Sequence, residues 1–247
     1  MARENFVMLI GVVQGSPVIN KEKQRARFSL QTMRRTGKID YPIINVLDKE
    51  LIPMVETFTE GDFVVTKGFL ATNNVKKSAI CEHCSEKNIA PGMLTEIIAM
   101  GIQNIGKSHT LQDWAEMSNH LMVIGTLCIN PGTRRTGEEK TPNCQYQIAV
   151  NRSYIVKGQS VTADYPWVKT TGEQAEQDSI RLQSGSQIYI RGAVQTRNLW
   201  RNVLCSHCGS AFRAEDFVAE IVPYSVEYLN KCIFPPRVSL TQEAIVS

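Results

Sequence analysis

Two short motifs have the residue types and spacing of metal ligands. Cys81 and Cys84 form a Cys-x-x-Cys motif (CEHC), and Cys205 and Cys208 form a second one (CSHC). A Cys-x-x-Cys turn presents two thiolates to one metal ion, and two such turns complete the four-cysteine set of a structural zinc site. One motif alone supplies too few ligands. The economical arrangement is one zinc ion held by all four cysteines, either within the chain or between the chains of an oligomer.

Other roles for these cysteines stay open. His83 or His207 could complete a separate site in each motif, although a His between two cysteines is poorly directed for joint ligation. A redox-active dithiol of the thioredoxin type would need a βαβ setting, which the sequence does not predict. The pairs could also be inert. The remaining cysteines do not repeat and are interpreted as ordinary thiols: Cys128, Cys144 and Cys232.

The sequence carries no pattern of catalytic residues. It contains no Gly-rich phosphate loop, no paired carboxylates at a repeated position and no nucleophile with a placed base. His109 and His120 are isolated. We therefore expect that the protein is not an enzyme.

The two cysteine motifs lie in a repeated sequence. Residues 5–11 (NFVMLIG) match residues 119–125 (NHLMVIG), and the tripeptide Asp-Tyr-Pro occurs at 40–42 and again at 164–166. From that tripeptide onward the register is constant through both cysteine motifs. Chance does not hold glycines and cysteines in register over such a length, so the chain contains a duplicated domain.

Each copy is predicted to be a β-barrel. Apolar or alternating segments of strand length recur in both copies, at 6–10, 27–32, 62–68 and 95–100 and at 120–124, 146–150, 186–192 and 218–222. A further strand, the third in each copy, starts at the Asp-Tyr-Pro tripeptide. Leu51, Met54, Val55 and Phe58 have helical spacing between the third and fourth strands. Five strands with a helix at this place form an OB fold. The prediction is an all-β chain of two tandem OB-fold five-stranded barrels: domains 1–105 and 119–230, a linker 106–118 and an extended or disordered tail 231–247.

The composition says less about function than the motifs do. The 27 basic residues nearly balance the 24 acidic ones, so the net charge of +3 permits a nucleic-acid partner without indicating one. The apolar run near the N-terminus is too short for a membrane span and is followed by no cleavage site. We expect a cytoplasmic protein, in a bacterial cell or in the host cell of a phage or mobile element, where cysteines stay reduced.

The second copy resembles a known family. Residues 119–125, 147–152 (QIAVNR) and 185–197 (GSQIYIRGAVQTR), followed by Trp200, resemble the bacterial and phage single-stranded-DNA-binding proteins. The resemblance covers nearly all of 119–225, and the first copy is related but more diverged. It implies sequence-tolerant binding of single-stranded DNA, in DNA replication, recombination or repair, by base stacking on aromatic side chains along a basic groove.

The resemblance also implies the binding residues. The expected stacking residues are Trp167, Trp200 and Tyr154, although any single ring could instead belong to a core. The expected phosphate-binding residues of the second copy are Arg152, Arg191, Arg197 and Arg201. The first copy has Ile43 in place of Trp167, and is expected to contribute charge, track length or assembly. Its basic residues are Arg34, Arg35, Lys38, Lys76 and Lys77.

Assembly is implied in the same way. Relatives commonly combine four barrels, so a chain with two barrels is expected to form a homodimer. Residues 240–247 contain one acidic residue, so recruitment of partner enzymes through an acidic C-terminal tip is doubtful. Two alternatives stay open: an adaptor or structural protein, held together by zinc, whose barrels bind other proteins, and a protein that binds RNA rather than DNA.

Overall fold

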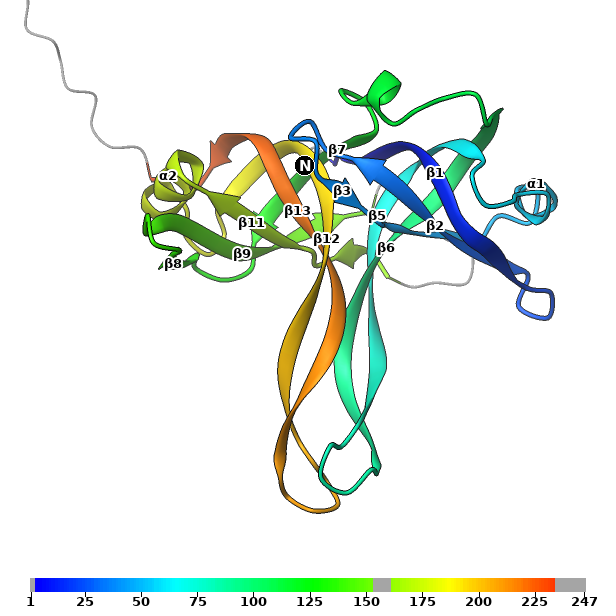
Figure 1. Cartoon of the computed structure of the whole chain (residues 1–247). Coiled ribbons are helices and arrows are strands. Elements are labelled where there is room, and N and C mark those ends of the chain that lie inside the picture. Colours follow the sequence, from blue (N-terminus) through cyan, green and yellow to red (C-terminus); the bar gives the residue numbers. More distant parts are fainter. Residues whose placement is uncertain (1–2, 153–160, 234–247) are drawn as a thin grey trace, which may run out of the picture.

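Buried and exposed side chains alternate along the strands of the first barrel. In β2, the residues Ala26, Phe28 and Leu30 are buried while those between them are not, as in a strand with one face on a core. The computed structural model describes residues 3–152 and 161–233 (Figure 1). The first repeat forms β1 (Asn5–Asn20), β2 (Arg25–Met33), β3 (Ile39–Asp40), β4 (Ile43–Val46), α1 (Ile52–Glu56), β5 (Phe63–Ile80) and β6 (Lys87–Gly106).

The second repeat forms the same elements with one added strand. They are β7 (Asn119–Leu127), β8 (Gly132–Thr136), β9 (Thr141–Asn151), β10 (Ala163–Asp164), β11 (Trp167–Thr171), α2 (Glu173–Arg181), β12 (Gln187–Leu204) and β13 (Ala211–Asn230). β1 pairs with β2 and β5, β2 with β4, and β5 with β6, and the parallel pair β4–β6 closes the barrel. The pair β11–β13 closes the second barrel equivalently. The predicted OB folds are confirmed.

Each helix lies in sequence just before the long hairpin, as predicted: α1 follows β4 and precedes β5, and α2 follows β11 and precedes β12. In the first barrel Val55 and Phe58 are buried, and the ring of Phe58 packs edge-on against Phe28 at 5.6 Å. Asp178 of α2 is fully buried and accepts hydrogen bonds from the hydroxyls of Tyr146 (3.1 Å) and Tyr228 (2.7 Å). Among the described residues no helix is long and apolar enough to cross a membrane.

The two barrels share one sheet. β1 and β7 pair antiparallel from Asn5 opposite Val123 to Leu9 opposite Asn119, so β12, β7, β1 and β5 are neighbours in a continuous sheet. The linker contains one short helical turn, a 3-10 helix at Gln112–Trp114. It ends at Ser118, whose fully buried hydroxyl donates to the Ile10 carbonyl at 2.6 Å. The barrels are therefore fixed to each other by backbone pairing.

Two long hairpins extend side by side from the barrels (Figure 1). The first consists of β5 and β6, the second of β12 and β13, and each ends in a Cys-x-x-Cys turn. Near the tips, Val203, Phe212 and Ala214 of the second hairpin are buried together with Cys81 of the first. Lys77 forms an ion pair with Asp216 across the two hairpins at 2.5 Å. The inner faces of the hairpins are thus packed together, and the outer faces are exposed.

Candidate nucleic-acid interface and metal centre

A groove in the wall of the second barrel contains Trp167. Val168 is fully buried, so the alternation of β11 turns Trp167 and Lys169 outward, where both are half-buried. β11 pairs with β9 so that Trp167 lies opposite Gln147 and Lys169 opposite Gln145. The groove has a volume of about 350 Å³ and is lined by Ile129, Asn130, Gly132, Thr133, Arg134, Asn143, Cys144, Gln145, Trp167 and Lys169. It offers an accessible ring beside amide and cationic groups.

Cations gather around Lys169. Burial lowers the pKa of the Lys169 ammonium, the Glu220 carboxylate opposes that shift, and three further cations lower the pKa again: Arg197, Arg134 and Lys38. Arg197 donates to Glu220 through Nε at 2.8 Å and Nη2 at 3.2 Å, and a third of its side chain stays exposed. Lys38 belongs to the first barrel. Positive charge from both barrels is therefore concentrated beside the Trp167 groove, which favours a polyanion.

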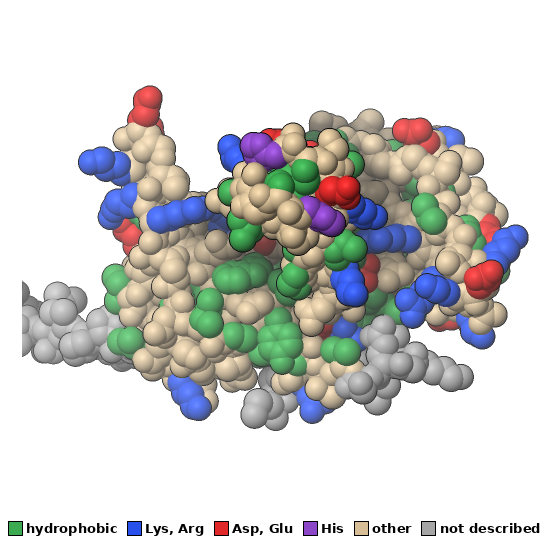
Figure 2. All heavy atoms as spheres, turned by 90° about the horizontal axis from the view of Figure 1, so that it is seen from below, with side chains coloured by type: hydrophobic (Ala, Val, Ile, Leu, Met, Phe, Trp, Pro, Cys, Tyr) green, Lys and Arg blue, Asp and Glu red, His purple; other side chains and the backbone are tan. Residues whose placement is uncertain are grey.

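Trp200 lies on the outer face of the second hairpin. Its side chain is 56% exposed, and the Arg213 guanidinium lies over the ring, 5.5 Å from its centroid. An exposed indole beside a guanidinium suits a base stacked on the ring with its phosphate held close by. Seen from below, Figure 2 shows hydrophobic side chains gathered beside the hairpins with Lys and Arg side chains around them.

The other arginines expected near these rings lie elsewhere. The alternation of β12 turns Arg201 to the inner face of the second hairpin. There its Nε lies 3.8 Å from Oδ2 of Asp216, the β13 residue that also pairs with Lys77 of the first hairpin. Arg191 is exposed on the β12–β7 wall, opposite Met122, and not on the β9–β11 wall that holds the groove. Tyr154 lies outside the described residues. The Trp167 groove and the Trp200 face therefore rely on other cations.

Two predicted DNA contacts, Arg34 and Arg152, are corrected by the structure. Both are buried, and each is paired with a fully buried carboxylate: Arg34 Nε lies 2.6 Å from Asp40, and Arg152 Nε lies 2.7 Å from Asp164. A guanidinium held in this way has little exposed surface to offer a phosphate, since less than a tenth of each side chain is exposed. We assign both side chains to the structural join between the barrels.

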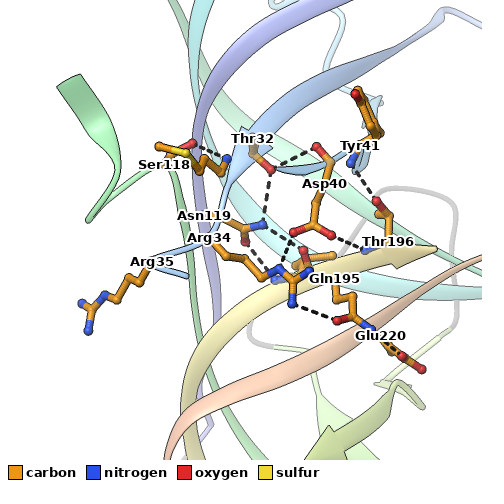
Figure 3. Close-up of polar contacts among 12 residues, drawn as sticks. Thr32, Arg34, Arg35, Asp40, Tyr41, Ser118, Asn119, Gln195, Thr196 and Glu220 are labelled. Atoms are coloured by element: carbon orange, nitrogen blue, oxygen red, sulfur yellow. Dashed lines mark hydrogen bonds and ion pairs between the residues drawn. The ribbon is translucent and has the colours of Figure 1, made fainter. Parts of the chain in front are cut away.

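Figure 3 shows this join at the first barrel. Asp40 accepts a hydrogen bond from the Thr196 N–H at 2.8 Å, and the Tyr41 N–H donates to the Thr196 hydroxyl at 2.7 Å. Arg34 also donates to Gln195 at 2.8 Å. The same contacts recur with the barrels exchanged, since Asp164 accepts from the Thr72 N–H at 2.7 Å. Each repeated Asp-Tyr-Pro thus fixes the base of the other barrel's hairpin.

The remaining first-barrel candidates do not form one surface. Arg35 pairs with Glu116 at 3.2 Å and lies 4.9 Å from the Tyr224 ring centroid. Lys76 is exposed on the outer face of the first hairpin, whereas Lys77 points inward to Asp216. Of these three, Arg35 and Lys76 are open to solvent for a DNA contact.

The four predicted metal ligands come together at the hairpin tips. The sulfurs of Cys81, Cys84, Cys205 and Cys208 all lie within 4.8 Å of one another. Two of the pairs cross between the hairpins: Cys81 to Cys208 at 3.8 Å and Cys84 to Cys205 at 3.6 Å. A tetrahedral zinc with Zn–S bonds of about 2.3 Å requires sulfurs roughly 3.8 Å apart. The chain thus forms a four-sulfur cluster of the right size within one molecule.

The surroundings of this cluster act unequally on its thiols. A backbone donor at Glu86 opposes the shift, but burial and the three neighbouring sulfurs raise the pKa of the Cys84 thiol to about 12. The N–H groups of His83 and His207 each donate to the first sulfur of their motif, Cys81 and Cys205, at 3.4 Å. Backbone donors, first Cys208 and then His207, lower the pKa of the Cys205 thiol to about 5. The two histidines therefore contribute backbone donors in equivalent positions, and all four sulfurs face one centre.

Three cations near the two rings were not predicted: Lys169, Arg134 and Arg213; Lys38 was expected only as one of the basic residues of the first copy. Strand alternation alone would have found Lys169, because it stands two residues after Trp167. Arg213 could not be predicted, because its contact with Trp200 depends on the register of the hairpin. In that register Arg213 stands opposite Asn202, two residues after Trp200. Lys38 comes from the other barrel, which only the three-dimensional arrangement reveals.

Comparisons with known proteins agree with this geometry. The model of the single-strand binding protein family matches residues 118–204. Single-stranded DNA-binding protein 2 of Clostridium acetobutylicum is 26% identical over 116 residues, which cover 45% of this chain and 77% of that protein.

Two solved structures resemble the whole chain. A deletion mutant of the single-stranded DNA binding protein from Thermus aquaticus has a TM-score of 0.64 and 18% identity, over 96% of this chain and all of that one. The wild-type Thermus aquaticus protein has a TM-score of 0.62 and 17% identity, over 93% and 95% of the two chains. At these identities the likeness concerns the fold, and it spans both barrels.

Proposed function

We propose that this chain, which belongs to the single-strand binding protein family through its second barrel, binds single-stranded DNA by stacking bases on Trp167 and Trp200. The observation that carries the proposal is the groove beside Trp167, where cations from both barrels surround an accessible ring. Every base has a π-face, so stacking tolerates any sequence, while the cations bind phosphates. Such a protein binds its ligand and catalyses no reaction.

The barrels have unequal parts in this proposal. The second provides the rings, together with Lys169, Arg134 and Arg197. The first adds the charge of Lys38, which acts on Lys169 of the groove, and extends the path available to a strand. We further propose that binding serves DNA replication, recombination or repair, in a phage or mobile element.

We propose that zinc joins the hairpin tips through Cys81, Cys84, Cys205 and Cys208. The sulfur spacing and the backbone donors support this proposal. Four protein ligands leave no open position, so the metal would be structural. It would hold the second hairpin, and with it Trp200, in a fixed direction.

We propose that two chains associate as a homodimer of four barrels. The β1–β7–β12 sheet carries half-buried apolar side chains on the face turned away from the barrel cores: Phe6, Met8, Met122, Ile124 and Tyr189. Such a face suits packing against its own copy, which satisfies a two-fold symmetric interface. Sedimentation equilibrium of the intact protein tests this assembly.

The binding proposal is tested with fluorescently labelled oligo-dT and the intact protein. Substituting either Trp167 or Trp200 with Ala should weaken binding about fivefold to 150-fold, since stacking contributes about 1–3 kcal/mol per base. W114F, in the linker, is the matched control and should leave the affinity unchanged. If wild-type protein does not bind the oligomer, an adaptor role for the barrels replaces this proposal. Tighter binding of oligo-U RNA would reassign the ligand.

A further inference from the structure

The first barrel has a groove of its own with different chemistry. Its volume is about 360 Å³, and it is lined by Val18, Asn20, Lys23, Arg25, Ala26, Arg27, Asn45, Asn73, Val75, Leu94 and Glu96. None of these lining residues is aromatic, so the groove has no stacking platform. It has amides along its floor and cations along one side, which is the composition of a site that recognises polar edges and an anion.

A carboxylate fixes the two amides of the floor. Glu96 is 5% exposed, and its Oε1 accepts hydrogen bonds from Asn45 Nδ2 at 3.1 Å and from Asn73 Nδ2 at 2.7 Å. Because a carboxylate only accepts, both Asn side chains must direct their amino groups to it. Their carbonyl oxygens are then turned away from Glu96. Both half-buried residues line the groove, so their carbonyl oxygens are free of Glu96 and are candidate acceptors for a ligand bound there.

The second barrel has cations at the equivalent places. In the constant register of the repeats, Lys169 corresponds to Asn45, Arg197 to Asn73 and Glu220 to Glu96. Glu220 is likewise buried, but its partner Arg197 is charged and has no acceptor. The two carboxylates are therefore equivalent in position but have different partners. Glu220 accepts from the Arg197 guanidinium and from the Gln195 amide, whereas both hydrogen-bond donors to Glu96 are Asn amides.

We propose that the groove of the first barrel is a base-selective subsite for single-stranded DNA that favours bases carrying an exocyclic amino group. The proposal rests on the proposed function. The amide oxygens of Asn45 and Asn73 accept from the amino groups of cytosine, adenine or guanine, whereas the carbonyl at the same position of thymine or uracil repels them. Phosphates are held by the cations Lys23, Arg25 and Arg27.

The charge balance of the groove supports a nucleic-acid strand. Arg27 lies opposite Asn45 in the β2–β4 pairing, 3.7 Å from Glu96, and 45% of its side chain is exposed. Its charge partly offsets that of Glu96, and Lys23 and Arg25 leave the groove with a net positive charge. A negatively charged strand is therefore attracted, while the amides select among its bases.

The test compares oligo-dC with oligo-dU, which share ring size and differ in the amino group. Labelled oligomers of about 30 nucleotides allow a strand to reach both barrels, since an OB fold covers about 4–16 nucleotides. At neutral pH, wild-type protein should bind oligo-dC about fivefold more tightly than oligo-dU, the ratio given by one net hydrogen bond. A ratio near one overturns the proposal.

Variants locate the preference. N45K/N73R gives the first groove the cations of the second, and should bring the ratio of the two affinities close to one while tightening oligo-dU binding. E96Q is the milder variant. Because Gln can donate as well as accept, the Asn45 and Asn73 amides are no longer held in one orientation. The ratio of oligo-dC to oligo-dU affinity should fall without loss of folding. N74K, at an exposed neighbouring position, is the matched control and should keep the wild-type ratio.

The outcomes separate the two proposals. If wild-type protein binds neither oligomer, the proposed function fails and this inference fails with it. If it binds both, and the preference persists unchanged in N45K/N73R and E96Q, single-strand binding stands and the base-selective subsite is refuted. Thermal melting of each variant shows whether it is folded.

Discussion

Replacing Asp164 with Asn tests how strongly the barrels are joined. The carboxylate is fully buried, accepts from Arg152 at 2.7 Å (Nε) and 2.8 Å (Nη2), and accepts from the Thr72 N–H at 2.7 Å. D164N keeps an oxygen for Thr72 but leaves the Arg152 guanidinium, 6% exposed, without its counter-charge. Removing one partner of a buried ion pair costs about 3–5 kcal/mol. We expect the free energy of unfolding to fall by about that amount.

The double variant R152M/D164N separates the buried charge from general disruption. It removes both charges, and Met keeps an apolar contact near the Phe69 ring, over which Arg152 lies at 5.7 Å. We expect it to be about 2 kcal/mol more stable than D164N, since a buried pair is often replaced by neutral residues at little cost. The assay is equilibrium urea unfolding of both variants and the wild type. A loss below about 1 kcal/mol for D164N, or a double variant no more stable than D164N, refutes the reasoning.

Three further predictions follow from the same structure. C205S should lower the zinc content measured by atomic emission and lower the melting temperature, whereas C128S, outside the cluster, should change neither. Burial raises the pKa of Asp178, so its carboxyl group contributes stability at acid pH that is lost as the pH rises. The melting temperature of the wild type relative to that of D178N should therefore increase from pH 7 to pH 5. A difference that stays constant with pH contradicts this prediction. K169M should reduce the slope of log affinity against log salt for oligo-dT by about 0.7, whereas exposed K49M should not.

The sequence predicted most of the fold because the repeats share one register. Glycine-bounded apolar strands recur in both copies, and the cysteine turns fall at the same place in each hairpin, so duplication alone indicated two barrels. It left open whether the cysteine turns meet within the chain or between chains. The helical spacing around Val55 indicated the short helix. These features depend on local patterns, which the chain displays twice.

The parts that failed depend on contacts between the copies. Arg34 and Arg152 stand near segments that resemble a binding strand, and nothing local shows that Asp40 and Asp164 bury them. Arg201 stands beside Trp200 in sequence, yet strand alternation places the two side chains on opposite faces of the hairpin. That hairpin has an inner face only because the two hairpins pack against each other.

The most direct test of the central claim is tryptophan emission during titration with oligo-dT. Trp114 is replaced with Phe, so that Trp167 and Trp200 are the remaining two of the three tryptophans in the chain. We predict saturable quenching that weakens with added salt, is reduced in W167F and in W200F, and is absent with duplex DNA of the same length. Unchanged emission with saturating oligo-dT would contradict stacking on these rings.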